Sequence, residues 1–394
     1  MKNYLYPVRD SPPQADAYNG GILNWLILQK VRLHTIKIKE IISNGVYDLA
    51  TDKKNGLIAE LLKAILFLLS FVYVFIITLV KLAYSLRILR SLSFSCKVIS
   101  VGNITLGGTG KTPFVKMLAR RLTQDGHKVV ILIRGYKRKN LNPEPLNLNP
   151  EMMGDEGYLL FKDLSLPVVV GRDRIKTANE AIEKYHPDII ILDDGFQHWR
   201  LKRDLDVVLI NALNPFGNGR VIPRGILRET LSALRRADIF VLTKTDLAED
   251  FKKTENELKE IGPSSLIVES RHQPIRLYDV NGKNFELSYI KDKEVCIFSA
   301  IGDPGSFSKM ILDLGAKVKF EFEFRDHFDY RQGELEKIIN ACKGSEVKLL
   351  ITTEKDAVKL AAFNIGNTIT ILVLEVELIL TKNRDEFYRR LSGI

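Results

Sequence analysis

The stretch Val98-Ile-Ser-Val-Gly-Asn-Ile-Thr-Leu-Gly-Gly-Thr-Gly-Lys-Thr112 decides the fold of this 394-residue chain. Its β-branched start predicts a strand, its glycines predict a tight turn, and a helical pattern follows over 114–122. This order is typical of a loop that binds nucleotide phosphates, in which backbone N–H groups approach the phosphates, a Lys reaches the β- and γ-phosphates and a hydroxyl ligates Mg²⁺. The residues expected in these roles are Gly107, Gly108, Thr109, Gly110, Lys111 and Thr112.

The strict pattern G-x-x-x-x-G-K-[ST] is not met, because Thr105 stands where its first Gly is expected. Glycine-rich turns between strands and helices are also common as purely structural features. The adjacent Lys111 and Thr112, the strand before them and the helix after them favour a phosphate loop.

The composition narrows the classes of partner. Lys and Arg number 58 against 48 Asp and Glu, which gives a formal net charge of +10. This excess suits nucleic acid, anionic lipid or phosphorylated substrates. The chain has no zinc finger, Arg/Gly-rich tract or aromatic-basic RNA motif, so we expect no nucleic-acid partner. Cys96, Cys296 and Cys342 lack metal-ligand spacing and even pairing, which indicates thiols in a reducing compartment.

Beyond residue 95, short apolar runs alternate with helical patterns, which predicts a parallel sheet with helices on both faces. Expected strands lie at 97–101, 129–133, 168–170, 189–192, 205–210 and 239–243. A composition shift at 260–276 indicates a connection to a smaller set, with strands at 295–300, 317–323, 348–353 and 368–374 and helices at 304–314, 332–341 and 384–391. The predicted fold class is α/β, a P-loop NTPase-type doubly wound, mostly parallel sheet with a second, smaller α/β domain and an N-terminal membrane helix.

Residues 64–80 read AILFLLSFVYVFIITLV, an uncharged run between Lys63 and Lys81. A run of about 17 residues is at the lower limit for a bilayer-spanning helix. Basic residues flank both ends, so the positive-inside rule does not separate a span from a helix lying in the bilayer surface. A fully buried core helix is the third interpretation.

These observations divide the chain into expected domains. The divisions are 1–60 for an extension without an assigned role, 61–95 for the membrane-anchoring helix region, 96–262 for the P-loop domain and 263–394 for the smaller domain, with a possible return of the terminal helix to the large one.

Two carboxylates, Asp193 and Asp194, end the predicted strand at 189–192. In doubly wound sheets, ligands bind beyond the carboxyl ends of strands, beside the phosphate loop. Carboxylates at that place can hold the Mg²⁺ that bridges nucleotide phosphates. Paired acids at strand ends are also ordinary turn formers, but the preceding phosphate loop favours the metal role.

Asp155 opens a helical stretch after a Pro/Asn-rich loop, where an acid is either a helix cap or a general base for an attacking hydroxyl. His327 lies beside Asp326 in a loop, where it is either structural or active in proton transfer near neutral pH. Several arginines near the expected nucleotide edge are either solvated or clamps for phosphates. They are Arg172, Arg174, Arg220, Arg224 and Arg228.

Leu242-Thr-Lys244-Thr-Asp246 matches the form [NT]-K-x-D with which GTPases read guanine. The pattern is short and arises often by chance. The match nevertheless supports a second hypothesis, a membrane-associated P-loop GTPase or metallochaperone-like switch. A comparison of ATP with GTP binding would distinguish this switch from a kinase. A membrane-tethered scaffold with a decayed nucleotide site is a third, disfavoured because the loop Lys, its Thr and the acids are all present.

Taken together, these segments resemble the tetraacyldisaccharide 4′-kinases of the lipid A pathway. The matching segments keep the family's order and are 101–113, 133–139 (IRGYKRK), 154–157 (GDEG), 192–210, 216–229 (FGNGRVIPRGILRE), 235–246, 324–330 (FRDHFDY) and 353–360 (TEKDAVKL). DDGFQH followed by P-x-G-x-L-R-E in one chain with a variant phosphate loop is specific to this family. The family's loop also lacks the first Gly, which accounts for Thr105.

The resemblance implies an activity and a place. The activity is transfer of the ATP γ-phosphoryl group, with Mg²⁺, to the 4′-hydroxyl of a tetraacylated glucosamine disaccharide 1-phosphate, a lipid A precursor. The place is the cytoplasmic face of the inner membrane of a Gram-negative-type bacterium, where an anchor near the N-terminus meets a lipid whose acyl chains stay in the bilayer.

The resemblance also implies site residues in the P-loop domain. Lys111 and Thr112 match the phosphate-loop Lys and the Mg²⁺-ligating hydroxyl, and Asp193 and Asp194 match the acidic pair near the metal. Arg174 and Arg228 match the arginines at the phosphates. Gln197 and His198 belong to the DDGFQH block.

Asp155 matches the family's catalytic acid residue, which is thought to act with a His that corresponds to His327. Because the two belong to different expected domains, we expect the domains to close on nucleotide binding. The sequence departs from the family pattern at Arg224, at GDEG in place of the commoner GDEP, and at Asp303, where Asn or His is frequent.

Overall fold

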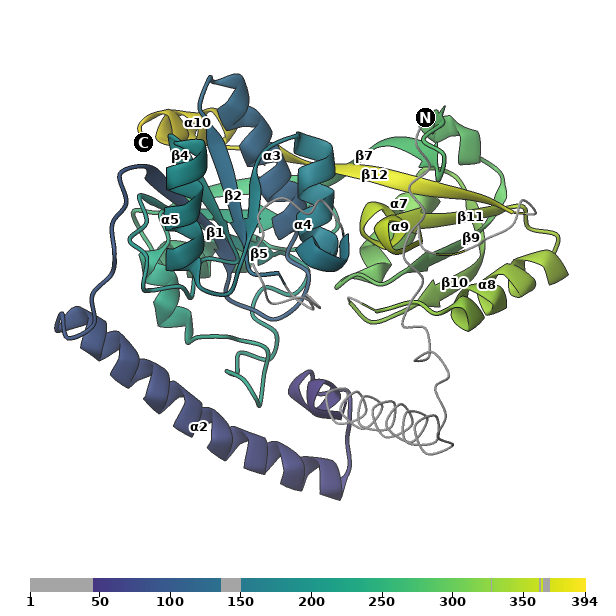
Figure 1. The fold of residues 1–394 in the computed structure, drawn as a ribbon. Coiled ribbons are helices and arrows are strands. Elements are labelled where there is room, and N and C mark those ends of the chain that lie inside the picture. The colour runs from purple at the N-terminus through teal and green to yellow at the C-terminus, as the bar shows by residue number, and fades with distance from the viewer. Residues whose placement is uncertain (1–44, 136–149, 327, 361–362, 364–368) are drawn as a thin grey trace, which may run out of the picture.

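A computed structural model gives the fold and describes residues 45–135, 150–326, 328–360, 363 and 369–394. Figure 1 shows a large lobe and a small lobe that are joined by two long strands, with a separate helix along the base of the large lobe.

The large lobe contains the parallel strands β1 (Lys97–Asn103), β2 (Val129–Ile133), β3 (Val168–Val170), β4 (Ile189–Asp193), β5 (Leu205–Asn211) and β6 (Ile239–Thr243). Its helices are α3 (Lys111–Gln124), α4 (Pro150–Leu164), α5 (Arg174–Tyr185), α6 (Lys252–Ile261) and α10 (Arg384–Ser392). Strands such as β4 are buried at every position, as parallel strands covered by helices on both faces must be. The strands predicted in this part are confirmed.

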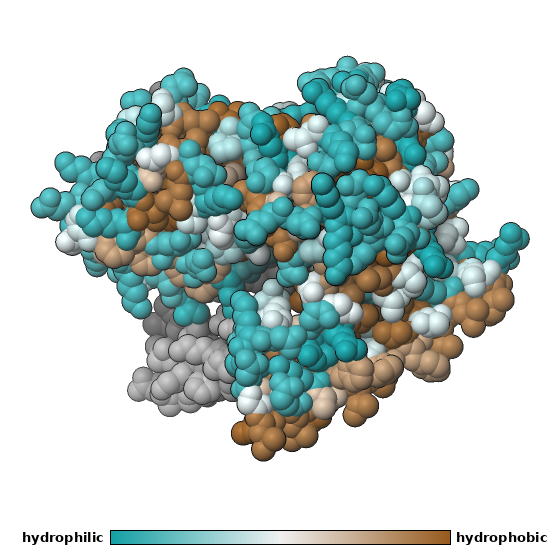
Figure 2. Space-filling model, turned by 180° about the vertical axis from the view of Figure 1, so that it is seen from behind, coloured by the Kyte–Doolittle hydropathy of each residue, from teal (hydrophilic) through white to brown (hydrophobic). Residues whose placement is uncertain are grey.

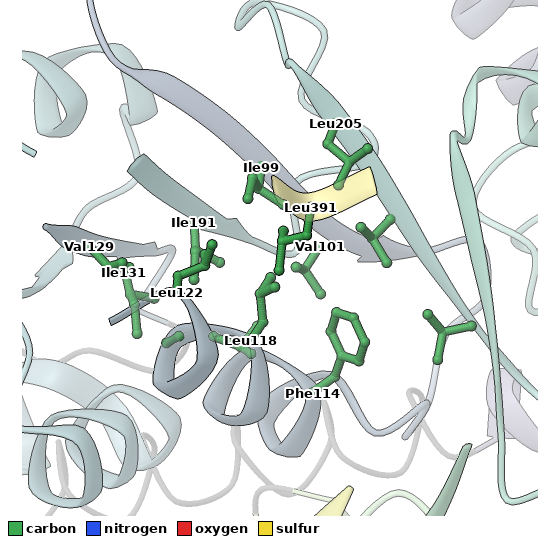
Figure 3. Close-up of a cluster of buried hydrophobic side chains, with 14 of the residues drawn as sticks. Ile99, Val101, Phe114, Leu118, Leu122, Val129, Ile131, Ile191, Leu205 and Leu391 are labelled. Atoms are coloured by element: carbon green, nitrogen blue, oxygen red, sulfur yellow. The ribbon is translucent and has the colours of Figure 1, made fainter. Parts of the chain in front are cut away.

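The core of the large lobe lies between α3 and the central strands. The buried α3 side chains Phe114, Leu118 and Leu122 recur every four residues and so form one face of the helix. Figure 3 shows this face pointing at Ile99 and its neighbours, with Leu391 of α10 in the same cluster. The carboxy-terminal helix therefore packs in the large lobe, although it follows the small lobe in sequence.

The small lobe repeats the architecture with fewer elements. Its strands are β9 (Glu294–Ser299), β10 (Lys317–Glu323) and β11 (Leu349–Thr353), and its helices are α7 (Pro304–Asp313), α8 (Gln332–Gly344) and α9 (Glu354–Leu360). All of them except α9 lie within a few residues of the positions expected from the sequence, which did not predict the helix α9 directly after β11.

Two strands belong to both lobes. β7 (Leu266–Asp279) pairs with β6 at its start, and β12 (Thr370–Lys382) pairs with β11 at its start. β7 and β12 run antiparallel to each other between the lobes. One sheet therefore has the order β10-β9-β11-β12-β7-β6-β5-β1-β4-β2-β3, with β8 (Asn284–Phe285) beside β7. The segment expected as a connection is an ordered strand, and the strand expected at 368–374 continues to residue 382 because β7 gives it a partner.

The apolar run forms the 29-residue helix α2 (Leu57–Ser85), which is longer at both ends than predicted. One face contacts the protein with helical periodicity, through residues 59, 63, 66, 67, 70, 73, 74 and 77. The rest is exposed: its most apolar 18-residue window is only 6% buried. The alternative of a fully buried core helix is therefore wrong. Figure 2 shows the apolar surface along the lower right, where α2 lies in that view.

Candidate active site

The phosphate loop lies between the end of β1 and the start of α3. Gly107 and Gly110 have φ angles of 108° and 80°, which glycine adopts without strain. Gly110 directly precedes Lys111, the first residue of α3. The first N–H groups of this helix therefore face the loop, as anion binding at a helix N-terminus requires.

Thr105 takes the place of the first glycine in the strict pattern. It is buried and forms a bridge with Leu227, and the Leu106 N–H donates to the Ile226 carbonyl at 2.7 Å. The loop is tied at this point to the segment 216–229 by backbone pairing. A β-branched residue suits that extended pairing, which explains why glycine is not needed here.

Lys111, Asp194 and Arg228 form a charged group beside the loop. Lys111 Nζ lies 3.6 Å from Asp194 Oδ1, and one Arg228 nitrogen donates to both carboxylate oxygens at 2.8 Å. Burial alone would raise the pKa of Asp194, but the Lys111 and Arg228 charges outweigh it and lower this pKa to about 2. Asp194 is therefore ionised at neutral pH.

Asp193 lies in a different environment from its neighbour. Its carboxyl is buried, and Oδ1 has no hydrogen-bond partner among the residues that the structure describes. Burial, followed by the nearby Glu156 charge, raises its pKa to about 7. Arg174 is buried beside it and donates to the Asp193 carbonyl at 2.7 Å, while its second terminal nitrogen lacks a partner within the described ranges. A buried acceptor and a buried donor, both without a partner in the described part of the chain, thus lie near the end of β4.

Gln197 and His198 follow the acids and hold the turn in place. Gln197 donates to the Asn103 carbonyl at 2.9 Å and accepts from Arg228 at 3.3 Å. Burial, with Arg174 next in effect, lowers the pKa of His198 to about 4. The imidazole is therefore neutral at physiological pH and adds no further cation to the site.

Arg228 is positioned by neighbours from three parts of the chain. Its N–H donates to the Ile104 carbonyl at 2.7 Å, and Tyr73 of α2 donates to its carbonyl at 3.0 Å. The adjacent Glu229 is fully buried and pairs with Arg236 at 2.9 Å and with Lys81 of α2 at 2.6 Å. The helix along the base of the large lobe is therefore joined directly to the segment that carries Arg228.

Arg220 and Arg224 contact the helix α2 and the turn before it. Arg224 pairs with Asp52 at 2.8 Å, before the start of α2, and Arg220 lies over the Phe67 ring, 4.8 Å from its centroid. These contacts hold α2 and the turn before it, and the interpretation of the two arginines as phosphate clamps stays a prediction. Arg172 is exposed on the surface.

Asp155 lies at a break in α4. Gly154 has φ 74° and ψ 163°, outside the helical region, and the helix resumes after it. The Asp155 carboxylate is 3.4 Å from the Lys359 ammonium group, which comes from α9 of the small lobe. His327, the expected partner of Asp155, lies outside the described residues.

The two lobes also meet at the phosphate loop. Lys244 at the end of β6 forms an ion pair with Asp303, the residue that caps α7. A Cβ on Gly108 would lie 3.2 Å from Gly302 Cα, so the loop backbone touches the small lobe. Lys244, which the guanine-reading hypothesis requires, is thus paired with a residue of the small lobe. Asp246, the other residue of that motif, is exposed.

Sequence reasoning did not single out three of these residues. Glu229 appeared only within the P-x-G-x-L-R-E motif, and Lys359 only within TEKDAVKL, without a predicted role for either residue. His272 had no signal, although its ring lies against the phosphate loop, 3.0 Å from where a Cβ on Gly110 would be. Each acts through a partner far away in sequence.

A phosphate loop and two acids at the carboxyl ends of parallel strands define a P-loop nucleotide-binding protein of the α/β class. The family model for tetraacyldisaccharide-1-phosphate 4′-kinases, LpxK, matches residues 62–393. The chain belongs to this family, whose members are lipid kinases.

Individual relatives agree with this assignment. The tetraacyldisaccharide 4′-kinase of Halothermothrix orenii is 36% identical over 346 residues, which cover 81% of this chain and 90% of the relative. The enzyme of the same name from Elusimicrobium minutum is 39% identical over 68% of this chain and 75% of its own length. Among solved structures, LpxK from Aquifex aeolicus in complex with ATP superposes with a TM-score of 0.63 at 33% identity, covering 83% of this chain and 99% of that one.

Proposed function

We propose that this chain transfers the γ-phosphoryl group of ATP to the 4′-hydroxyl of a tetraacylated glucosamine disaccharide 1-phosphate, a precursor of lipid A. The observation that carries the proposal is the charged group of Lys111, Asp194 and Arg228 beside the glycine-rich loop. Family membership supplies the acceptor, and the ATP complex of the Aquifex aeolicus relative supports ATP as the donor.

Oxygen donors at the site fit Mg²⁺. Both Asp194 oxygens are held by Arg228, whereas Asp193 Oδ1 has no hydrogen-bond partner in the described part of the chain. We therefore assign direct metal ligation to Asp193, with the Thr112 hydroxyl as the second protein ligand, since Mg²⁺ prefers hard oxygen ligands. When bound, the metal neutralises charge on the β- and γ-phosphates. Arg174 and Lys111 would hold the same phosphates from the protein side.

Phosphoryl transfer requires positioning and charge neutralisation more than covalent chemistry. We assign proton removal from the sugar hydroxyl to Asp155, at the break in α4, and propose that His327 assists it. Arg228 would stabilise charge on the transferring group. In this scheme the large lobe, 96–262 with α10, holds the nucleotide, and the small lobe completes the site.

The fold also favours one mode of membrane contact. α2 is joined to the protein along one face, by Ser70 to Val221 at 2.9 Å in the middle of the helix and by Lys81 to Glu229 at 2.6 Å near its C-terminal end. A helix held lengthwise in this way exposes its other face without crossing a bilayer. We infer that α2 lies in the cytoplasmic surface of the inner membrane and brings the site to the acyl disaccharide.

Incubation of the purified protein with ATP, Mg²⁺ and acylated disaccharide 1-phosphate in detergent tests the proposal directly. We expect a new monophosphate ester on the disaccharide, and far less product when GTP replaces ATP. Lys111→Met serves as the inactive control. Absence of product from folded wild-type protein would refute the assignment, and preference for GTP would revive the GTPase hypothesis.

A further inference from the structure

Two carboxylates of the large lobe face two lysines of the small lobe at the break in α4. Lys359 Nζ lies 3.4 Å from Asp155 Oδ2, and Lys355 Nζ lies 3.2 Å from Glu156 Oε1. The lysines are four residues apart, so they lie on one face of α9 and meet neighbouring residues of α4. Lys359 thus joins the small lobe directly to the proposed general base, and Lys355 joins it to the next residue of α4.

Both lysines are largely removed from solvent. Their side chains are 8% exposed for Lys359 and 16% for Lys355. Burial lowers the pKa of Lys355, but the charges of Glu156 and Asp326 outweigh this effect and raise the pKa. A buried ammonium group is retained only where paired carboxylates offset its lost hydration. The burial therefore indicates that the positions of these charges are constrained by the fold.

The two lysines differ in how they contact their partners. Lys355 Nζ donates to Asp326 at 2.8 Å and to Glu156 at 3.2 Å. Lys359 Nζ has no hydrogen-bond partner within the described ranges, although Asp155 and Asp356 lie 3.4 and 3.7 Å away. Lys355 is thus a hydrogen-bonded link, whereas Lys359 acts mainly through its charge.

We propose that Lys359 is a positioning residue for phosphoryl transfer, which holds the Asp155 carboxylate ionised and aimed at the sugar hydroxyl. The inference rests on the proposed function. In that reaction the hydroxyl oxygen forms a bond to the γ-phosphorus, the bond from this phosphorus to the β–γ bridging oxygen breaks, ADP leaves and the hydroxyl proton passes to Asp155. A base must be unprotonated and correctly placed for this step, and a cation within about 4 Å favours the charged carboxylate.

Other charged groups near Asp155 do not replace Lys359. Glu156 follows it on α4 and is paired with Lys355, and Asp326 shares the same lysine. Asp356 on α9 is held by the Tyr330 hydroxyl at 3.1 Å and by the Ala300 N–H at 2.9 Å. Lys359 therefore places a positive charge directly beside Asp155, and its removal changes the field there. Because Lys359 belongs to the small lobe, it can position the Asp155 carboxylate only when α9 lies against α4.

Kinetics of Lys359→Met test the inference, because Met keeps the length of the side chain and removes its charge. We expect kcat to fall by about 10- to 100-fold, the loss typical of a misplaced catalytic group, with the KM for ATP within about threefold. We also expect the acidic limb of the kcat/KM profile to move up by about one pH unit. Lys359→Arg should restore much of the activity and the original limb.

Two controls separate positioning from a merely structural role. Lys337→Met, on the exposed face of α8, should behave as wild type. In an Asp155→Asn background, Lys359→Met should cause little additional loss, because the group that it positions is gone. If Lys359→Met shows no thermal unfolding transition and is therefore not folded, Lys359→Gln provides the same test.

The outcomes separate this inference from the proposed function. Two results would overturn the inference alone, provided that the wild type is active. One is a Lys359→Met variant whose kcat is within threefold of the wild type. The other is an unchanged acidic limb together with a full additional loss of activity when Lys359→Met is added to Asp155→Asn. A wild type without kinase activity would overturn the proposed function.

Discussion

The two lobes contribute different halves of the site. The large lobe carries the phosphate loop after β1, both acids at the end of β4, Arg174 at the start of α5, and Arg228 on the longer connection between β5 and β6. The small lobe reaches the site through Asp303, Lys355 and Lys359, each of which pairs with a residue of the large lobe. Under the proposed function, this difference assigns nucleotide binding to the large lobe and makes catalysis depend on contact between the lobes.

Replacement of the proposed base should separate chemistry from binding most strongly. Asp155→Asn keeps the shape of the side chain and removes its basicity, so we expect turnover to fall by about 10²- to 10⁴-fold. ATP affinity should stay within about threefold, as measured by calorimetry. The exposed Asp246→Asn is the matched control and should leave both unchanged. A large loss of ATP binding in Asp155→Asn would instead reassign this carboxylate to the metal.

Membrane attachment should reside in α2 and not in the small lobe. Phe75 and Ile76 are 63% and 54% exposed on α2, and transfer of such a side chain into lipid stabilises binding by about 1.5–3 kcal/mol. We expect Phe75→Gln with Ile76→Gln to weaken co-sedimentation with phospholipid vesicles by at least about tenfold. Leu312→Gln, an equally exposed apolar position on α7, should have no effect. Equal losses at both places would contradict the assignment of the membrane face.

Nucleotide should change the distance between the lobes. Lys176 on α5 and Lys337 on α8 are exposed positions for spectroscopic labels introduced as cysteines in a Cys96→Ser background. We expect the distance distribution to shorten when a non-hydrolysable ATP analogue and Mg²⁺ are added, because the small lobe touches the phosphate loop at Gly302. Identical distributions with and without nucleotide would refute closure.

His272 on β7 should make the junction between the lobes sensitive to acid. Burial, followed by the Lys244 charge, lowers its pKa to about 4. The unfolded chain, with a His pKa near 6.5, then binds a proton that the folded state excludes. Stability is therefore full above about pH 6.5 and falls as the pH drops towards 4. Urea titrations at pH 7.5 and at pH 5 give the drop in unfolding free energy between these two pH values. We expect this drop to be roughly 1–2 kcal/mol smaller for His272→Gln than for the wild type. Equal losses would show that this ring is not excluded from protonation.

Local sequence determined much of the fold. β-branched runs identified the central strands, and the alternating pattern of Lys317–Glu323 identified β10 with the right bounds, because both patterns report burial directly. Asp194 and Arg228 were named from strand ends and motif matches, and the structure places them in contact. These features depend on residues that are close in sequence or on one shared edge of the sheet.

Features that depend on distant partners were not predicted. Nothing near Arg224 shows that Asp52 is its partner, 172 positions earlier. The length of β12 depends on its pairing with β7, and the role of Lys359 depends on α4 lying against α9. Such contacts follow from tertiary packing, which periodicity and spacing do not encode.

Calorimetric titration of ATP with Mg²⁺ into the wild type and Lys111→Met tests the central claim most directly, with Lys176→Met on the exposed face of α5 as the control. The account predicts that wild type and control bind ATP with one site, and that Lys111→Met loses at least about tenfold in affinity, since a charged hydrogen bond to phosphate is lost. A folded wild type that binds no ATP, or a Lys111→Met variant that binds it equally well, would contradict the account.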